Sequence, residues 1–331
     1  MPELIQHPCV WTAKDLADRN DWQIELSADE RDALSALSDS SPTQSPPDSL
    51  NRLAETLRDR LEHSTGFVIL RRADVATRSA ESAAKLFLRF CEIIGTPVSQ
   101  SAQGELIYSV RDAGYADTDP RSRGPNTRKK LTFHSDRCDV IGFLCVQQAL
   151  SGGENDIVSS AAVYNTLAEL RPDLLAELMQ PFYYLRHTVD PANPRPWCRQ
   201  PVFSFTDGHF ACSLLRVLID RAAAMPDLPD LTDRQREALD AVEDIASRPD
   251  MHYSFRQQPG DILFLNNWVT LHRRSEFTDA AEEQLQRHIL RVWLSVPNSR
   301  PLDEFFRDNY GSVAAGAIRG GMRSNGLLKS E

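Results

Sequence analysis

The segment LTFHSDRCDV, residues 131–140, places a histidine and an aspartate two positions apart. If this segment is a strand, residues i and i+2 face the same side, so His134 and Asp136 can direct an imidazole and a carboxylate at one point. His272, in LFLNNWVTLHRRS, is the strongest candidate for a third ligand from a distant strand. Two histidines and one carboxylate on one face of an iron ion leave the opposite face open, as in non-haem Fe(II) oxygenases. An isolated H-x-D is common, and a purely structural role is the alternative for each residue.

A second feature is an arginine within an apolar segment, RHILRVWLSV, which is typical of a strand. An inward-facing guanidinium is costly unless it meets an anion, and it can hold a carboxylate through two parallel hydrogen bonds. We therefore predict that Arg291 clamps the far carboxylate of a dicarboxylic 2-oxo acid bound at the metal. Arg287 lies four positions earlier and shares this face if the strand includes it. A surface salt bridge is the structural alternative for Arg291.

The elements that must position these residues are mainly strands. From Leu131 onward, short apolar segments alternate with turn residues, which indicates a sandwich or jelly-roll barrel. The turn TDG, residues 206–208, predicts a hairpin. Amphipathic helices are expected to pack outside this core, with starts near Thr12 and Ser27 and further helices over 50–66, 79–95, 159–180 (broken at Pro172) and 231–248. The predicted fold is mainly β with flanking helices and a jelly-roll core.

No sequence feature marks a boundary between autonomous domains, so residues 1–331 are expected to form a single domain. Within it we expect an N-terminal helical segment (1–64), a core with helical insertions (65–300) and a C-terminal extension (301–331). The Ser/Pro-rich stretch 38–50 cannot bury a core and is predicted to be a flexible loop. Loops 112–130 and 189–200 are predicted to act as lids.

Composition bears on whether the protein binds nucleic acid, crosses a membrane or is secreted. The chain has 331 residues, 41% hydrophobic and 25% charged, with a formal net charge of −10, which argues against nucleic-acid binding. No apolar stretch approaches the ~20 residues of a membrane helix. The six cysteines form no C-x-x-C pair, and the N-terminus does not resemble a secretory signal, so we expect a cytoplasmic protein with free thiols. Homo-oligomerisation is left open.

Several motifs, taken in order and spacing, resemble one family: HSD (134–136), SGGEN (151–155), PGDILFLNNWVTLHRRSEF (259–277) and RHILRVWL (287–294). They are similar to motifs of the TauD/TfdA superfamily, also called clavaminate-synthase-like. Its members are Fe(II)- and 2-oxoglutarate-dependent oxygenases on a double-stranded β-helix, a cupin-like jelly roll. The likeness extends from about residue 9 to residue 320.

The resemblance implies Fe(II), 2-oxoglutarate as cosubstrate, and O2. It implies His134, Asp136 and His272 as iron ligands and Arg291 as the partner of the distal carboxylate of 2-oxoglutarate. The family often has Thr or Ser after the GG-acid motif, where a hydroxyl meets the cosubstrate. Here the residue is Asn155, whose amide can also donate a hydrogen bond, and a turn role is its alternative.

The implied reaction is hydroxylation of an unactivated C–H bond, with release of succinate and CO2, on a small amino-acid-like or carboxylated metabolite. Asp136 argues against halogenation, because related halogenases have Gly or Ala there. Desaturation, epimerisation or cyclisation in natural-product biosynthesis remain alternatives. A non-catalytic cupin-like binding protein and a zinc hydrolase are the competing classes. Five residues are candidates for substrate contact: Gln100, Ser101, Gln103, Tyr108 and Arg274, the last with a structural ion pair as its alternative.

Overall fold

The architecture was analysed in a computed structural model that describes residues 2–39, 44–73, 78–115, 119, 124–187 and 190–323. The strands are β1 (Gln23–Glu25), β2 (Phe67–Arg71), β3 (Thr96–Val98), β4 (Ile107–Val110), β5 (Val140–Gln147), β6 (Ser151–Gly152), β7 (Asn155–Ser159), β8 (Phe182–Leu185), β9 (Trp197–Gln200), β10 (Phe203–Thr206), β11 (His209–Cys212), β12 (His252–Phe255), β13 (Ile262–Asn266), β14 (Thr270–Arg274), β15 (Phe277–Thr278) and β16 (His288–Ser295). The helices are α1 (Ala13–Ala17), α2 (Ala28–Ala36), α3 (Asp48–His63), α4 (Ala80–Ile94), α5 (Ser160–Leu170), α6 (Pro172–Leu178), α7 (Arg216–Ala223), α8 (Asp233–Ala246) and α9 (Arg307–Tyr310), with 3-10 turns η1 (Gly124–Asn126), η2 (Glu283–Leu285) and η3 (Glu304–Phe306).

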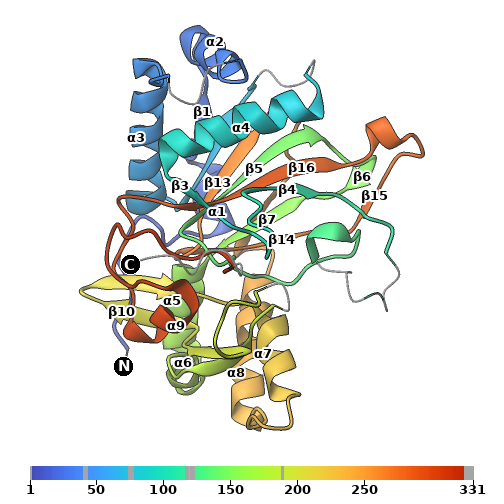
Figure 1. The fold of residues 1–331 in the computed structure, drawn as a ribbon. Helices are drawn as coiled ribbons and strands as arrows, with labels where there is room; N and C mark the ends of the chain where they lie inside the picture. The colour runs from blue at the N-terminus through green and yellow to red at the C-terminus, as the bar shows by residue number, and fades with distance from the viewer. Residues whose placement is uncertain are drawn as a thin grey trace.

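Two β-sheets form the centre of the fold. The larger has the strand order β1-β2-β13-β5-β16-β3, with β4 also paired to β16, and the smaller has the order β12-β7-β14. Apolar side chains from both sheets share one core, including Ile141 of β5, Leu263 of β13 and Ile157 of β7. The sheets therefore lie face to face, with β5 and β16 across from β7 and β14 (Figure 1). This arrangement matches the prediction of a mainly β fold with flanking helices.

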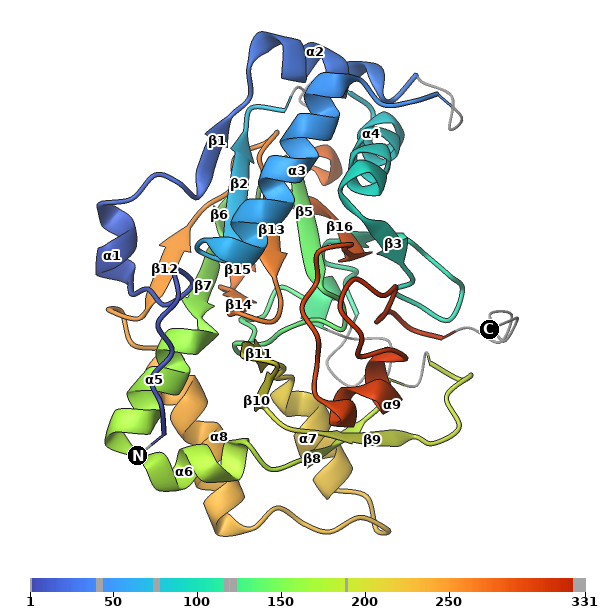
Figure 2. The same ribbon diagram turned by 90° about the vertical axis from the view of Figure 1, so that its left-hand side faces the viewer.

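Strand alternation explains why helices cover the outer face of the larger sheet. In β13, Leu263 and Leu265 face the smaller sheet, whereas Ile262 and Phe264 face outward. The outward side chains pack on apolar residues of α2, α3 and α4. Figure 2 shows α3 lying across this face in front of β2, β5 and β13. The predicted N-caps Thr12 of α1 and Ser27 of α2 are both present, each in a capping box.

A third apolar cluster joins α5, α6 and α8 to the hairpin β10–β11. The break expected at Pro172 separates α5 from α6, and Thr232 caps α8, as predicted. The predicted hairpin turn has Asp207 and Gly208 at φ 49° and 79°, the paired positive values of a type I′ turn. Among the described residues, no helix is both long enough and apolar enough to cross a membrane.

Three local predictions need correction. Residues 131–136 form no strand; the segment has a single β-bridge, between His134 and His272, and the strand begins at β5. The helix α7 was not predicted, because its residues follow β11 directly and its apolar pattern is short. The expected loop 38–50 is shorter, since α3 begins at Asp48; its residues 40–43 lie outside the described part of the chain.

The two loops predicted to act as lids contain regular structure. Loop 112–130 contains η1, loop 189–200 contains β9, and both include positions that are not described.

Candidate active site

The residues predicted as metal ligands come together between the two sheets. His134 and His272 pair as neighbours in an antiparallel bridge: each backbone N–H donates to the other's carbonyl, at 3.0 and 2.9 Å. His272 is held at the centre of β14, which pairs with β7. Asp136 is fixed differently, because its backbone N–H donates to Asn267 Oδ1 at 3.0 Å.

Two hydrogen bonds between Ser135 and Leu214 fix the segment that the sequence predicted to be a strand. Its N–H donates to the carbonyl of Leu214 at 2.8 Å, and its Oγ accepts from the N–H of Leu214 at 3.0 Å. These two bonds hold Ser135 against Leu214, and the side chains of its neighbours His134 and Asp136 converge with His272. His134 and Asp136 therefore point to the same place, as the H-x-D spacing predicted, but the cause is the pairing of Ser135 with Leu214 and not a strand.

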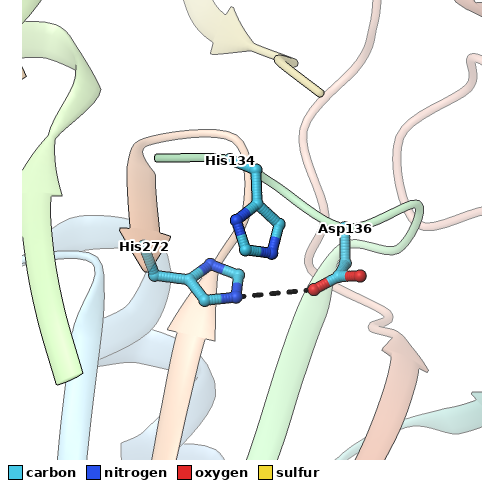
Figure 3. Close-up of side chains that lie close together, drawn as sticks. All are labelled: His134, Asp136 and His272. Carbon is cyan, nitrogen blue, oxygen red and sulfur yellow. Dashed lines mark ion pairs between the residues drawn. The ribbon is translucent and has the colours of Figure 1, made fainter. Parts of the chain in front are cut away.

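The three side chains converge closely (Figure 3). One ligand atom from each of His134, Asp136 and His272 lies within 4.8 Å of the others, and His272 Nε2 is 3.5 Å from Asp136 Oδ2. In the described part of the chain, this is the single group of three or more His, Cys, Asp or Glu side chains close enough to share a metal ion.

The donor set fits a divalent metal. His134 Nδ1 lies 2.9 Å from the carbonyl of Thr132, which fixes the tautomer with Nε2 free for a metal. Asp136 Oδ2 is buried without a hydrogen-bond partner, as expected of an oxygen meant for a cation. Burial, together with His272, lowers the pKa of His134 to about 4. Burial alone would raise the pKa of Asp136, but Arg291 and the two histidines lower it below its usual range. At neutral pH His134 is thus neutral and Asp136 ionised, the forms that bind metal.

The triad opens into a cavity of about 450 Å³. Arg274, Arg287, Arg291 and Asn155 also line it, so four of the predicted residues lie beside the triad. The other candidates for substrate contact are not among the described residues that line this cavity: Gln100, Ser101, Gln103 and Tyr108.

Arg291 and the two nearest of those candidates form one cluster. Arg291 Nε donates to Gln100 Oε1 at 2.7 Å, and its guanidinium carbon lies 5.4 Å from the ring of Tyr108 and 5.0 Å from that of Trp293. Its Nη1 is 3.5 Å from Asp136 Oδ1. Gln100 and Tyr108 therefore contact Arg291, which lines the cavity, and help to fix the position of its guanidinium.

Arg287 has a different environment, immediately before β16. Its side chain is buried, yet its Nε and Nη1 have no hydrogen-bond partner. Burial lowers its pKa to about 10, which still leaves it charged at neutral pH. A Cβ on Gly153 would lie 3.2 Å from Arg287 Nε, so the glycine of the GGEN motif leaves room for this guanidinium. An unpaired buried cation that faces a cavity needs an anion.

Two more polar residues complete this end of the cavity. Asn155 Nδ2 donates to Gln257 Oε1 at 3.2 Å, and this orients its amide. Arg274 is held by backbone carbonyls, since its Nη2 donates to Lys129 and its Nε donates to Ser275 at 3.2 Å. Burial, with the charge of Arg287, lowers the pKa of Arg274 to about 9. Arg274 therefore has a structural role and also adds positive charge to the cavity.

Sequence reasoning missed several polar residues that also line the cavity: Gln200, Ser213, Asn309 and Tyr310. They belong to β9, to the loop after β11 and to α9, and no short motif connects them.

Comparison with known proteins agrees with this geometry. The family model "Taurine catabolism dioxygenase TauD, TfdA family" matches residues 34–293. The chain belongs to the TauD/TfdA family. It is therefore an oxygenase that uses non-haem iron, 2-oxoglutarate and O2, as the sequence predicted, and the zinc-hydrolase and binding-protein alternatives are not supported.

Curated relatives of this TauD/TfdA chain include a synthase and a taurine hydroxylase-like protein. The "FR-33289 synthase" of Streptomyces rubellomurinus is 28% identical over 319 residues, covering 91% of this chain and 94% of the relative. The "Taurine hydroxylase-like protein SAT17" of Stachybotrys chartarum is 28% identical over 330 residues, covering 90% of this chain and 83% of the relative.

Solved structures share the fold. An asparagine oxygenase in complex with Fe(II), 2S,3S-3-hydroxyasparagine and succinate has a TM-score of 0.60 at 16% identity, covering 82% of this chain and 93% of the other. The non-heme iron oxygenase OrfP in complex with Fe and alpha-ketoglutaric acid also has a TM-score of 0.60, at 17% identity, covering 89% and 99%. These likenesses confirm the jelly-roll fold class.

Proposed function

We propose that His134, Asp136 and His272 bind the Fe(II) of this oxygenase, and that Arg287 and Asn155 bind the distal carboxylate of 2-oxoglutarate. The observation that carries the proposal is the unpaired, buried guanidinium of Arg287 in the same cavity as a triad held ready for metal. When bound, iron with 2-oxoglutarate and O2 supplies the oxidant for a substrate C–H bond, and the cosubstrate leaves as succinate and CO2.

The choice of Arg287 over Arg291 rests on their contacts. Arg291 Nη1 already lies 3.5 Å from Asp136 Oδ1, so it sits beside the end of the cosubstrate that binds iron. The distal carboxylate is separated from that end by the carbon chain of 2-oxoglutarate. Arg287 lies four residues earlier in the chain and has free N–H groups, which suits two parallel hydrogen bonds to a carboxylate. The second N–H of Asn155 can reach the same carboxylate in place of the family's hydroxyl.

The chain's own residues supply binding, orientation and exclusion of water. Gln100 and Trp293 hold Arg291 against Asp136, and this leaves Asp136 Oδ2 directed at the metal position. Apolar side chains make up much of the remaining lining, among them Leu215 and Ile289, and keep bulk water from the reacting centre.

The charge of the cavity supports an anionic substrate, in line with the carboxylated metabolite predicted from sequence. Asp136 is the one carboxylate among its described lining residues. Iron and 2-oxoglutarate offset each other's charge, so Arg274, Arg287 and Arg291 leave an excess of positive charge around the substrate. Hydroxylation is the outcome we propose, with desaturation, epimerisation and cyclisation as outcomes that product analysis separates. A cytoplasmic location remains part of the proposal, and free thiols at six buried cysteines are compatible with it.

The test is turnover of 2-oxoglutarate. Protein loaded anaerobically with Fe(II), then given O2 and 2-oxoglutarate, should form succinate, and an added substrate should accelerate this. Asp136→Ala should remove the activity while circular dichroism stays unchanged. Tight binding of zinc with no succinate from the iron-loaded protein would contradict the proposal.

A further inference from the structure

The part of the chain after β16 contributes to the cavity wall. Residues 301–323 lie beyond the end of the match to the family model at residue 293. Nevertheless Asn309, Tyr310 and Met322 line the cavity that contains the metal triad. We propose that this segment forms the substrate side of the active site, and that these three residues set substrate specificity. The inference rests on the proposed function, because it assigns the opposite end of the cavity to 2-oxoglutarate.

A buried ion pair fixes the segment to the metal-binding region. Arg319 Nε donates to Asp139 Oδ1 at 2.7 Å, and the two side chains are 0% and 1% exposed. The same carboxylate accepts from Trp268 Nε1 at 2.9 Å and from the N–H of Val296 at 3.2 Å. Arg319 also donates to the carbonyl of Arg300 at 2.7 Å. A buried pair with this many hydrogen bonds holds one geometry, and Asp139 is three residues from the proposed ligand Asp136.

Two glycines allow the backbone to approach that region. Gly320 and Gly321 have φ of +82° and +67°. The N–H of Gly321 donates to the carbonyl of Arg137 at 2.8 Å, and Arg137 Nε donates back to the carbonyl of Gly321 at 2.6 Å. A Cβ at Gly320 would lie 2.5 Å from the carbonyl oxygen of Arg137. Because Arg137 directly follows Asp136, the segment is packed against the loop that presents a metal ligand, and Met322 comes next along it.

Four polar side chains of this wall form one hydrogen-bonded cluster. Asn309 Nδ2 donates to Gln200 Oε1 at 2.9 Å, and Gln200 Nε2 donates to Ser213 Oγ at 2.8 Å. Tyr310 Oη is 3.3 Å from the same Ser213 Oγ. Ser213 precedes Leu214, which is bonded to Ser135 between the two ligands of the H-x-D motif. The cluster therefore lies next to the metal position.

The members of the cluster are uncharged, and all four line the cavity. Burial raises the pKa of Tyr310, so its hydroxyl remains protonated. Asn309 Oδ1 and the hydroxyl of Tyr310 have hydrogen-bonding capacity beyond the contacts above. Such groups suit a hydroxyl or amide of the substrate, while Met322 offers apolar contact. Arg137 and Arg186 also line the cavity, but they are paired with Asp190 and Asp308. Nε and Nη1 of Arg287 have no hydrogen-bond partner, so the inferred substrate side offers mainly uncharged polar and apolar contacts.

The first test measures selectivity. Wild type, Asn309→Ala, Tyr310→Phe and Met322→Ala are compared by succinate release on taurine, L-glutamate, L-asparagine and N-acetyl-L-asparagine. We expect the KM of the best of these compounds to rise roughly tenfold, as for one lost hydrogen bond in Asn309→Ala and Tyr310→Phe or lost apolar contact in Met322→Ala, and the order of preference to change. The KM for 2-oxoglutarate should stay within about twofold. Ile318→Ala, in the same segment but 68% exposed, is the matched control and should behave as wild type. Unchanged selectivity in all three variants, or equal effects on 2-oxoglutarate, would overturn the inference.

The second test needs no substrate. The protein has five methionines, including Met322. Their methyl groups are labelled with ¹³C, and their NMR signals are followed while Mn(II) is added. Met322→Leu assigns the signal. We expect Mn(II) at one equivalent to broaden the Met322 signal, because this methyl lines the cavity of the metal triad, and Zn(II) to leave it sharp. Bound Mn(II) with a sharp Met322 signal would overturn the placement of the segment. No binding of Mn(II) at all would instead overturn the proposed metal site.

Discussion

Arg291 Nη1 lies 3.5 Å from Asp136 Oδ1, so this arginine contacts a proposed metal ligand. Its Nε is occupied by Gln100, and aromatic rings flank its guanidinium. Arg287 lines the same cavity and its guanidinium lies 5.2 Å from the ring of Phe277, but its Nε and Nη1 have no hydrogen-bond partner. The sequence favoured Arg291 as the cosubstrate clamp because apolar residues surround it, yet the contacts favour Arg287. The two arginines are therefore expected to differ in function.

Replacing Arg287 should weaken binding of 2-oxoglutarate far more than replacing Arg291. Arg287→Met removes a charge-assisted pair of hydrogen bonds worth roughly 2–3 kcal/mol, or a roughly 30- to 150-fold loss of affinity. Arg291→Met should change this affinity less than about tenfold. Anaerobic titration of the Fe(II) protein with 2-oxoglutarate measures both. A larger loss of affinity for 2-oxoglutarate in Arg291→Met than in Arg287→Met would show that Arg291 binds the distal carboxylate.

Substrate charge should govern turnover. Because the described lining residues combine six arginines and one lysine with a single carboxylate, anionic compounds are expected to stimulate succinate formation and cationic ones are not. L-Glutamate and L-arginine share the same α-amino-acid group and differ in side-chain charge, which suits this comparison. Faster turnover with L-arginine than with any acidic compound would refute the charge argument.

The metal-free protein should lose stability in mild acid. Burial, with His272, lowers the pKa of His134 to about 4, whereas in the unfolded chain it has the ordinary histidine pKa of 6.5. Between these values the unfolded state binds a proton that the folded state does not, so stability falls as pH drops from 6.5 to 4 and levels off below. The largest contribution is about 3 kcal/mol. Urea unfolding of wild type and His134→Gln across this range checks it; equal pH dependence in both would show that His134 is not responsible.

Breaking the buried pair of the C-terminal segment should cost more than breaking an exposed one. Arg319→Leu leaves Asp139 buried without its partner and should destabilise by about 3–5 kcal/mol. Arg307→Leu breaks an ion pair with Glu304 whose side chains are 54% and 70% exposed, and should leave stability nearly unchanged because solvent screens such a pair. Urea denaturation midpoints distinguish the two. Similar midpoints for both variants would mean that Asp139 does not depend on Arg319.

Short-range features of the site could be predicted from the sequence. The H-x-D spacing indicated two inward side chains, and His134 and Asp136 do face one point. The reason was only partly foreseen, because Leu214 bonds Ser135 and no strand forms there. The fold class followed from strand alternation and turn residues, which are local signals.

Long-range features could not be predicted in the same way. Asn309 and Tyr310 reach the cavity because Arg319 pairs with Asp139, a contact spanning 180 residues of sequence. No local pattern identifies such a partner. Gln100 was expected to touch substrate, but β16 places Arg291 between it and the cavity. Only the assembled sheet determines which of these polar side chains faces inward.

The most direct test of the central claim is the visible absorption of the anaerobic protein. Fe(II) and 2-oxoglutarate added together should give a weak charge-transfer band, because both must meet at His134, Asp136 and His272. His134→Ala and Asp136→Ala should lack the band, and Arg287→Met should need much more 2-oxoglutarate to reach it. A wild-type protein that binds Fe(II) and 2-oxoglutarate without this band, or an Asp136→Ala variant that keeps it, would contradict the account.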